Sequence, residues 1–169
     1  MNKLIVALFV FVSAFSCSLK AEEIDVKASA DVERKFNVKS SYNETISWAE
    51  QNKSLIRDTM EVKVLKDFGN GKLKVAKQTP KGTFVWVMQE EIVQNKGQSI
   101  YKSKLVESVS GGLVYSDTWI TLKPIEKGCS VHIRMAAGVS TGNITNKNMN
   151  FDLATLTGKC RKLIESELN

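Results

Sequence analysis

Histidine is nearly missing from this chain: His132 is the only one among 169 residues. A metal site built from several histidines is therefore excluded, and a Ser-His-Asp triad would depend on His132 alone. Its neighbours Val131 and Ile133 are apolar, so strand alternation places His132 on the opposite, solvent-facing side. Glycine-rich phosphate loops, His-Glu-x-x-His and Cys-x-x-Cys are also absent. We expect no metal site and no cofactor, and we assign no catalytic residue.

Proline is scarce too, with two residues, and the chain contains no internal repeat and no low-complexity stretch. The hydrophobic fraction of 43% is enough for one domain with a real core at this length. No apolar run is long enough to span a membrane. The longest, residues 4–19, is uncharged and mostly apolar but falls short of the about 20 residues that a spanning helix needs.

That run has the three parts of a secretory signal. A basic start with Lys3 precedes it, and the sequence becomes polar at Lys20. We expect a signal peptide over residues 1–21, cleaved after the small residue Ala21, and a single domain over residues 22–169. The protein would then be periplasmic or secreted. An alternative uses Cys17, because Ala-Phe-Ser-Cys over residues 14–17 faintly resembles a lipobox, and Cys17 would then carry a lipid anchor.

The chain also lacks a strong excess of charge of one sign. The formal net charge is +6, and removal of residues 1–21 takes away Lys3 and Lys20 and leaves +4. Nucleic-acid binding needs a concentrated basic patch, and lysine and arginine are not clustered here. We therefore expect no nucleic-acid partner, while weak contact with an anionic membrane surface stays open. The sequence does not indicate the oligomeric state.

The first segment after the leader has the clearest strand pattern. From Ile24 to Val38, apolar side chains alternate with polar ones, which is typical of a strand with one buried face. Arg34 interrupts the apolar side. Ser41 and Glu44 then have the spacing of a capping box, which predicts a helix start, and a second short helical turn follows over residues 53–58.

Six further strand-like segments follow, most of them ending at a glycine-containing turn. They cover residues 60–68, 72–79, 83–94, 98–109, 113–124 and 129–139. The chain ends in a long amphipathic helix over residues 149–168. Its apolar stripe comprises Met149, Leu153, Leu156, Cys160, Leu163, Ile164 and Leu168.

Short turns predict antiparallel neighbours, and one long helix after a run of strands must bury its stripe against their concave face. The expected fold is α+β, a curved seven-stranded antiparallel sheet wrapped around a C-terminal helix. This order, together with the long first strand that runs into Ser41–Glu44, resembles the helix-grip fold of the START-like (SRPBCC) superfamily. That superfamily includes polyketide cyclase and lipid-transport-like families. The resemblance implies an apolar cavity between the sheet and the last helix.

Candidate ligand-binding residues follow from the inward faces of these elements. Small side chains at Ala28, Ala30 and Ala137 should leave room beneath the helix. The expected wall and its polar end comprise Arg34, Trp86, Met88, Glu90, Ile133, Met135, Leu153 and Leu156. Trp86 and Met88 fit ordinary core packing as well as a ligand wall.

Three ionisable residues, Arg34, Glu90 and Asp117, fall on or near inward faces. Burial of an unpaired charge is costly, so strand ends, bulges or mutual ion pairs are one interpretation. The other is that one or two of them orient the polar head of a ligand.

Two cysteines, Cys129 and Cys160, face the same layer from the last strand and the last helix. In an oxidising compartment we expect them to form a disulfide. The alternative is a pair of buried thiols that pack as small hydrophobic groups.

The sequence favours an exported binding protein for a small hydrophobic or lipid-like ligand held between sheet and helix. An enzyme of the cyclase or hydrolase type that uses cavity carboxylates is an alternative, and so is a protein-interaction domain with no ligand. The single histidine and the lack of an arranged nucleophile favour binding over catalysis.

Overall fold

A computed structural model describes residues 25–80, 82–95 and 97–169. The predicted signal peptide, its cleavage site at Ala21 and the alternative lipid site at Cys17 lie outside the described residues. Among the helices of the described part, none is long and apolar enough to cross a membrane.

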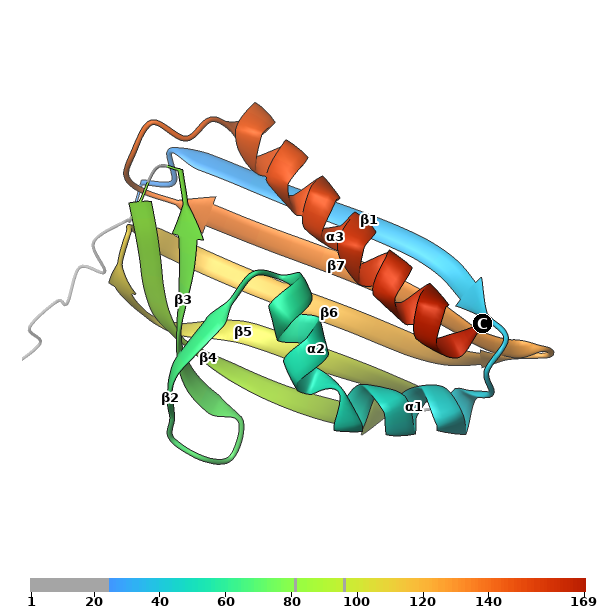
Figure 1. Ribbon diagram of the computed structural model, residues 1–169. Helices are drawn as coiled ribbons and strands as arrows, with labels where there is room; N and C mark the ends of the chain where they lie inside the picture. The colour runs from blue at the N-terminus through green and yellow to red at the C-terminus, as the bar shows by residue number, and fades with distance from the viewer. Residues whose placement is uncertain (1–24, 81, 96) are drawn as a thin grey trace, which may run out of the picture.

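Seven antiparallel strands form one curved sheet, and three helices cover its concave side (Figure 1). Neighbouring strands follow the order β1-β7-β6-β5-β4-β3-β2, so helices α1 and α2 carry the chain from one sheet edge to the other. The predicted helix-grip fold is confirmed. The elements are β1 (Ala28–Val38), α1 (Tyr42–Gln51), α2 (Lys53–Thr59), β2 (Lys63–Asp67), β3 (Lys72–Thr79), β4 (Gly82–Asn95), β5 (Gln98–Ser110), β6 (Leu113–Ile125), β7 (Gly128–Val139) and α3 (Asn146–Leu168).

Strand β1 has the alternation that its sequence predicts, with Ala28, Ala30, Phe36 and Val38 buried on the concave face. It pairs with β7 along its whole length. The capping box is present at the start of α1: the Ser41 hydroxyl accepts from the Glu44 amide, and the Glu44 carboxylate accepts from the Ser41 amide. Both donors would otherwise lack partners in the first helical turn.

The first segment after α2 differs from the prediction. The strand expected over residues 60–68 is shorter, because Met60 is the C-cap of α2 and Glu61 has a left-handed backbone, with φ of 60°. Met60 and Val62 are therefore buried by the turn that leaves α2 and not by a strand face. All of β2 is exposed, as an edge strand can be.

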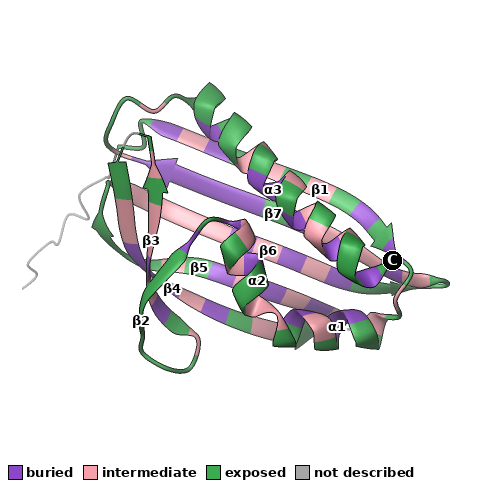
Figure 2. Cartoon of the chain, in the orientation of Figure 1, coloured by how far each residue is buried: buried purple, intermediate pink, exposed green. Residues whose placement is uncertain are grey.

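Helix α3 begins at Asn146, three residues before the predicted start, with Thr145 as a side-chain N-cap. It lies obliquely across β1 and β7, and its buried residues face the sheet (Figure 2). The predicted stripe is confirmed in outline. Leu153 and Leu163 are only half-buried, while Thr157, which the predicted stripe did not include, is fully buried.

The space beneath α3 contains two apolar clusters. The larger includes Cys160, Ile164 and Leu168 from the C-terminal half of α3, and it is completed by α1, α2 and the sheet. The smaller lies near the start of α3 and consists mainly of small side chains. Its buried members are Ala28, Ala30, Ala137, Val139 and Met149.

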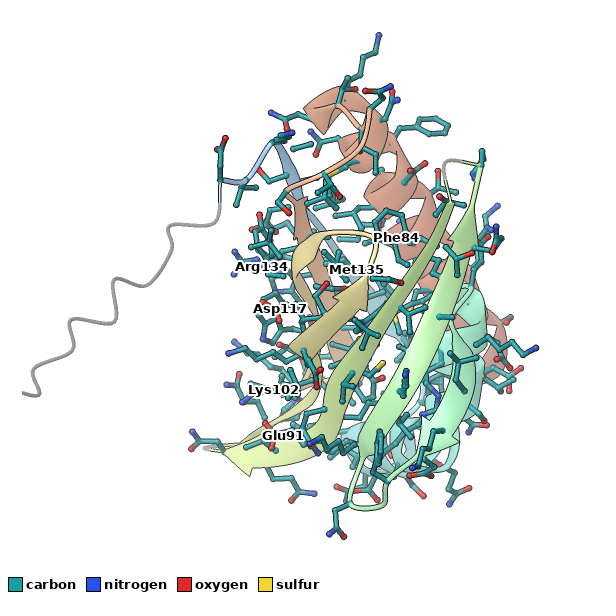
Figure 3. All side chains as sticks on the ribbon, turned by 90° about the vertical axis from the view of Figure 1, so that its left-hand side faces the viewer. Phe84, Glu91, Lys102, Asp117, Arg134 and Met135 are labelled. Carbon is teal, nitrogen blue, oxygen red and sulfur yellow. The ribbon has the colours of Figure 1, made fainter. Side chains whose placement is uncertain are left out.

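The outer face of the sheet is polar. A row of side chains crosses it from β1 to β4: Asp31 pairs with Arg134, Arg134 lies over the ring of Trp119, and Lys102 pairs with Glu91. Figure 3 shows Arg134, Lys102 and Glu91 on the side away from Met135 and Phe84. Because the outer face is polar, a buried apolar site can form only on the concave face of the sheet.

Candidate functional site: a cavity beneath helix α3

A cavity of about 470 Å³ lies between the first half of α3, the concave sheet face and the turn that follows α2. Cavities of this size are typical of small-molecule sites. The exposed residues Phe151 and Pro80 border it, so it reaches the surface. Its apolar wall includes Val62, Phe84, Trp86, Leu113, Val139, Ile144, Leu153 and Leu156.

Methionine is unusually concentrated in this wall. Met60, Met88, Met135 and Met149 come from four separate elements or turns, and all four line the cavity. A thioether side chain is unbranched and polarisable, so it adapts to ligands of different shape. Opposite α3, Ala137 on the concave face of β7 leaves volume that a larger side chain would fill.

The structure places five of the eight predicted ligand-binding residues at this cavity. They are Trp86, Met88, Met135, Leu153 and Leu156. Arg34, Glu90 and Ile133 do not line it. Whether the five contact a ligand stays a prediction.

Arg34 points inward, as the alternation of β1 predicts, but it lies against α3. Its Nε donates to Thr157 Oγ1 at 3.1 Å, and its Nη2 donates to the Ala154 carbonyl oxygen at 3.2 Å. Arg34 therefore joins β1 to the middle of the helix, which accounts for the buried Thr157. It does not provide a polar end for the cavity.

Glu90 forms a buried ion pair instead of facing the cavity. Its Oε2 accepts from Arg57 of α2 at 2.5 Å, and its Oε1 accepts from the Tyr101 hydroxyl at 2.9 Å. Burial, followed by the Glu90 charge, raises the pKa of Tyr101 above its usual range. With both oxygens engaged, this carboxylate anchors α2 to the sheet.

Ile133 is completely buried in the larger cluster. It is paired with Arg34 of β1 and Ile120 of β6, two positions along β7 from Met135. Alternation predicts the face of both residues correctly. It does not tell how far along the strand the cavity extends.

Asp117 borders the cavity, but its carboxylate belongs to the outer face. The residue lies between Lys104 and Ala136 in the sheet, and Figure 3 shows it on the side of Arg134 and Lys102. Its Oδ1 is buried without a hydrogen-bond partner. Burial raises its pKa, while Lys104 lowers it to a lesser degree.

Cys129 and Cys160 are both free, buried thiols, so the structure does not contain the predicted disulfide. They belong to the same cluster but have different neighbours. Thr45 of α1 interacts with Cys129, whereas Cys160 faces the Tyr101 side of the core. Burial raises the pKa of both thiols, to about 12 for Cys160.

His132 lies on the outer face as expected, with Nε2 at 2.8 Å from Glu33 Oε2. Among the residues that the structure describes, no group of histidine, cysteine and carboxylate side chains is suited to hold a metal ion.

Sequence reasoning missed the polar part of the cavity. Lys77 lines its side, where its ammonium donates to the Met60 carbonyl oxygen at 3.1 Å and pairs with Glu61. Burial lowers the pKa of Lys77, and Glu61 opposes that effect. Ser103 and Thr118 lie deeper and are almost fully buried. Alternation along β5 and β6 was the signal that could have found both hydroxyls.

No protein-family model matches this sequence, and no curated protein matches it either. Solved structures do match in three dimensions. Ara h 8.0201 has a TM-score of 0.56 and 10% identity, with 83% of this chain and 97% of that chain covered. A START superfamily protein from Mycobacterium smegmatis has a TM-score of 0.56 and 11% identity, with 82% and 96% covered.

A third match is the Zhui aromatase/cyclase from Streptomyces sp. R1128. Its TM-score is 0.50 and its identity 9%, with 82% of this chain and 93% of that chain covered. At such identities the likeness concerns the fold. The chain therefore has the helix-grip fold of START-like proteins, as its order of elements predicts.

Proposed function

We propose that this protein binds a small hydrophobic or lipid-like ligand in the cavity beneath α3. One observation supports this above all: a cavity of about 470 Å³, walled by methionine, aromatic and aliphatic side chains, reaches the surface of a folded domain. Apolar surface removed from water contributes about 25 cal/mol per Å². Such a site can therefore hold an apolar ligand without any catalytic group.

Binding is favoured over catalysis by the positions of the charged groups. Glu90 is engaged by Arg57 and Tyr101, the Asp117 carboxylate lies with the outer face, and His132 is on the outer face too. Of the carboxylate residues that border the cavity, Asp117 directs its carboxylate to the outer face and Asp152 of α3 is exposed, so neither carboxylate is enclosed in the cavity as a cyclase or hydrolase would need. A ligand-free interaction domain would need a filled core, and this core is hollow at one end.

The test is the binding of a fluorescent fatty acid to the wild type and to two blocked variants, Leu156→Trp and Met135→Trp. Both residues line the cavity, and the larger ring should fill it at a cost of about 1–3 kcal/mol of stability. Leu163→Trp is the matched control, because Leu163 is half-buried on α3 but does not line the cavity.

We expect the wild type and Leu163→Trp to bind the probe, and the two blocked variants to lose binding at least tenfold. Native mass spectrometry of the purified protein, which detects a co-purified lipid, is a second measurement. A wild type that binds no apolar probe across a broad panel would contradict the proposal, as would blocked variants that bind like the wild type.

Export is part of the same proposal and rests on the sequence of residues 1–21 alone. The basic start, the apolar run and the small residue Ala21 support cleavage after Ala21. The intact mass of the protein from its native compartment tests this. A chain that begins with a lipid-modified Cys17 would contradict cleavage after Ala21 and support the lipid-anchored alternative.

A further inference from the structure

The floor of the cavity carries a pair of buried hydroxyl groups. Ser103 of β5 and Thr118 of β6 are direct cross-strand partners, and both side chains line the cavity. Ser103 is 7% exposed and Thr118 is 8% exposed. Side chains in such a pair lie about 5 Å apart on the same face. One small molecule can therefore contact both hydroxyls at once.

Among the residues that the structure describes, neither hydroxyl has a good acceptor. Ser103 Oγ donates to the Met88 sulfur at 3.9 Å, and Thr118 Oγ1 donates to the Met60 sulfur at 3.6 Å. A thioether sulfur is a weak acceptor, whereas buried hydroxyls in proteins normally bond to oxygen. Two donors are thus held almost out of water, side by side, and face an apolar cavity with their hydrogen-bonding capacity barely used.

The groups around this pair limit the charge of what could bind there. Glu90, the neighbour of Ser103 on β4, already holds Arg57, so that cation is not available to a ligand anion. The Lys77 ammonium is bonded to the Met60 carbonyl oxygen and to Glu61. Lys147, the other lysine that lines the cavity, is exposed in the first turn of α3. A ligand carboxylate on the buried floor would therefore lack a buried counter-charge, which is costly.

We propose that the ligand carries a neutral oxygen acceptor, a carbonyl oxygen, that enters first and accepts hydrogen bonds from Ser103 and Thr118. A carbonyl oxygen has two lone pairs and can accept from both hydroxyls. The apolar body of the ligand then extends past the methionine side chains towards Phe84 and Met149. This inference rests on the proposed function. It adds to that function the polar group that the site selects and the direction in which the ligand enters the cavity.

The test uses acetylnaphthalene and isopropenylnaphthalene, which have nearly the same shape and differ by a carbonyl oxygen in place of a methylene group. Calorimetry measures both affinities for the wild type and for the Ser103→Ala/Thr118→Val double variant. We expect the wild type to prefer the ketone by about five- to tenfold, the range of one net hydrogen bond or slightly more. We expect the double variant to lose that preference and to keep its affinity for the hydrocarbon.

Thr157→Val is the matched control. The Thr157 hydroxyl is also fully buried, but it lies outside the cavity, where it accepts from Arg34 and donates to the Ala154 carbonyl oxygen. Its loss should lower the melting temperature and leave the ketone preference unchanged. The double variant gives up only contacts with sulfur, so its melting temperature should stay close to that of the wild type.

A second readout needs no variant. The carbonyl stretching band of the bound ketone should move to lower wavenumber than in hexane, because hydrogen bonding weakens the carbonyl bond. A band at the hexane position would overturn the inference, as would equal affinities of the two probes for the wild type or a preference that survives in the double variant. If neither probe nor any other apolar molecule binds, the proposed function itself fails.

Discussion

The two ends of the space beneath α3 use the same alternating sheet faces, yet one is packed and the other is hollow. At the packed end, Cys160, Ile164 and Leu168 meet large residues of the sheet, and α1 closes the side. At the hollow end, the helix faces small side chains, among them Ala137 of β7, which lines the cavity. The comparison shows that a cavity forms where the strand residues are small and, in the described part of the chain, α3 is the one helix that covers the sheet.

The largest expected effect comes from truncation at the packed end. Ile164→Ala should lower the free energy of unfolding by about 3–4 kcal/mol, because Ile164 is fully buried and the space cannot refill. Leu153→Ala at the hollow end should cost about 1 kcal/mol, since Leu153 already borders an open cavity. Urea unfolding measures both. Equal losses would show that the two ends do not differ in packing.

The Arg57–Glu90 pair holds α2 over the boundary between the ends. Glu90→Gln should lower the free energy of unfolding by about 2–3 kcal/mol, because it leaves a largely buried guanidinium without its counter-charge. The cost stays below that of a fully buried pair, since Arg57 keeps 17% of its side chain exposed. Lys102→Gln on the outer face, which loses the exposed pair with Glu91, is the control and should cost far less.

Alkaline pH should weaken the packed end through Cys160. Its folded pKa is about 12, against about 9 for an unperturbed thiol, because burial disfavours the thiolate. Above about pH 9 the unfolded chain loses this proton and the folded chain keeps it. Stability should therefore be intact below about pH 9 and fall by about 1.4 kcal/mol per pH unit above it.

Cys160→Ala should make that decline shallower, although Cys129 and Tyr101, whose pKa values are also raised, continue to contribute. Denaturant unfolding between about pH 8 and pH 10 measures the slope of the free energy of unfolding against pH. A variant with the same slope as the wild type would assign the decline to other groups.

The smallest effect is expected at the exposed pair that links α3 to the turn after α2. Lys159 bonds to Glu61, and both side chains are about half exposed. Lys159→Gln should cost less than about 1 kcal/mol, because exposed ion pairs contribute little. Thermal unfolding at low and high salt measures it. A salt-independent loss of several kcal/mol would mean that this contact stabilises the hollow end more than its exposure indicates.

The sequence predicted more of the fold than of the site. The alternation of β1, the capping box at Ser41 and the stripe of α3 are local patterns, and the structure has all three. Five cavity residues followed from the same patterns. Arg34 and Glu90 were placed on the correct face, but the sequence left open whether they pair within the protein or face a ligand, because their partners Thr157 and Arg57 are distant in the chain.

The sequence by itself determined which elements form and which face of each is buried, because period-two and helical repeats express interactions between near neighbours. Only the tertiary structure decided where along those faces the core ends and the cavity begins. That boundary depends on the path of α3 across the sheet and on the position of α1. Met135 and Ile133 show the result: two residues apart on one face of β7, one borders a cavity and the other lies in the packed core.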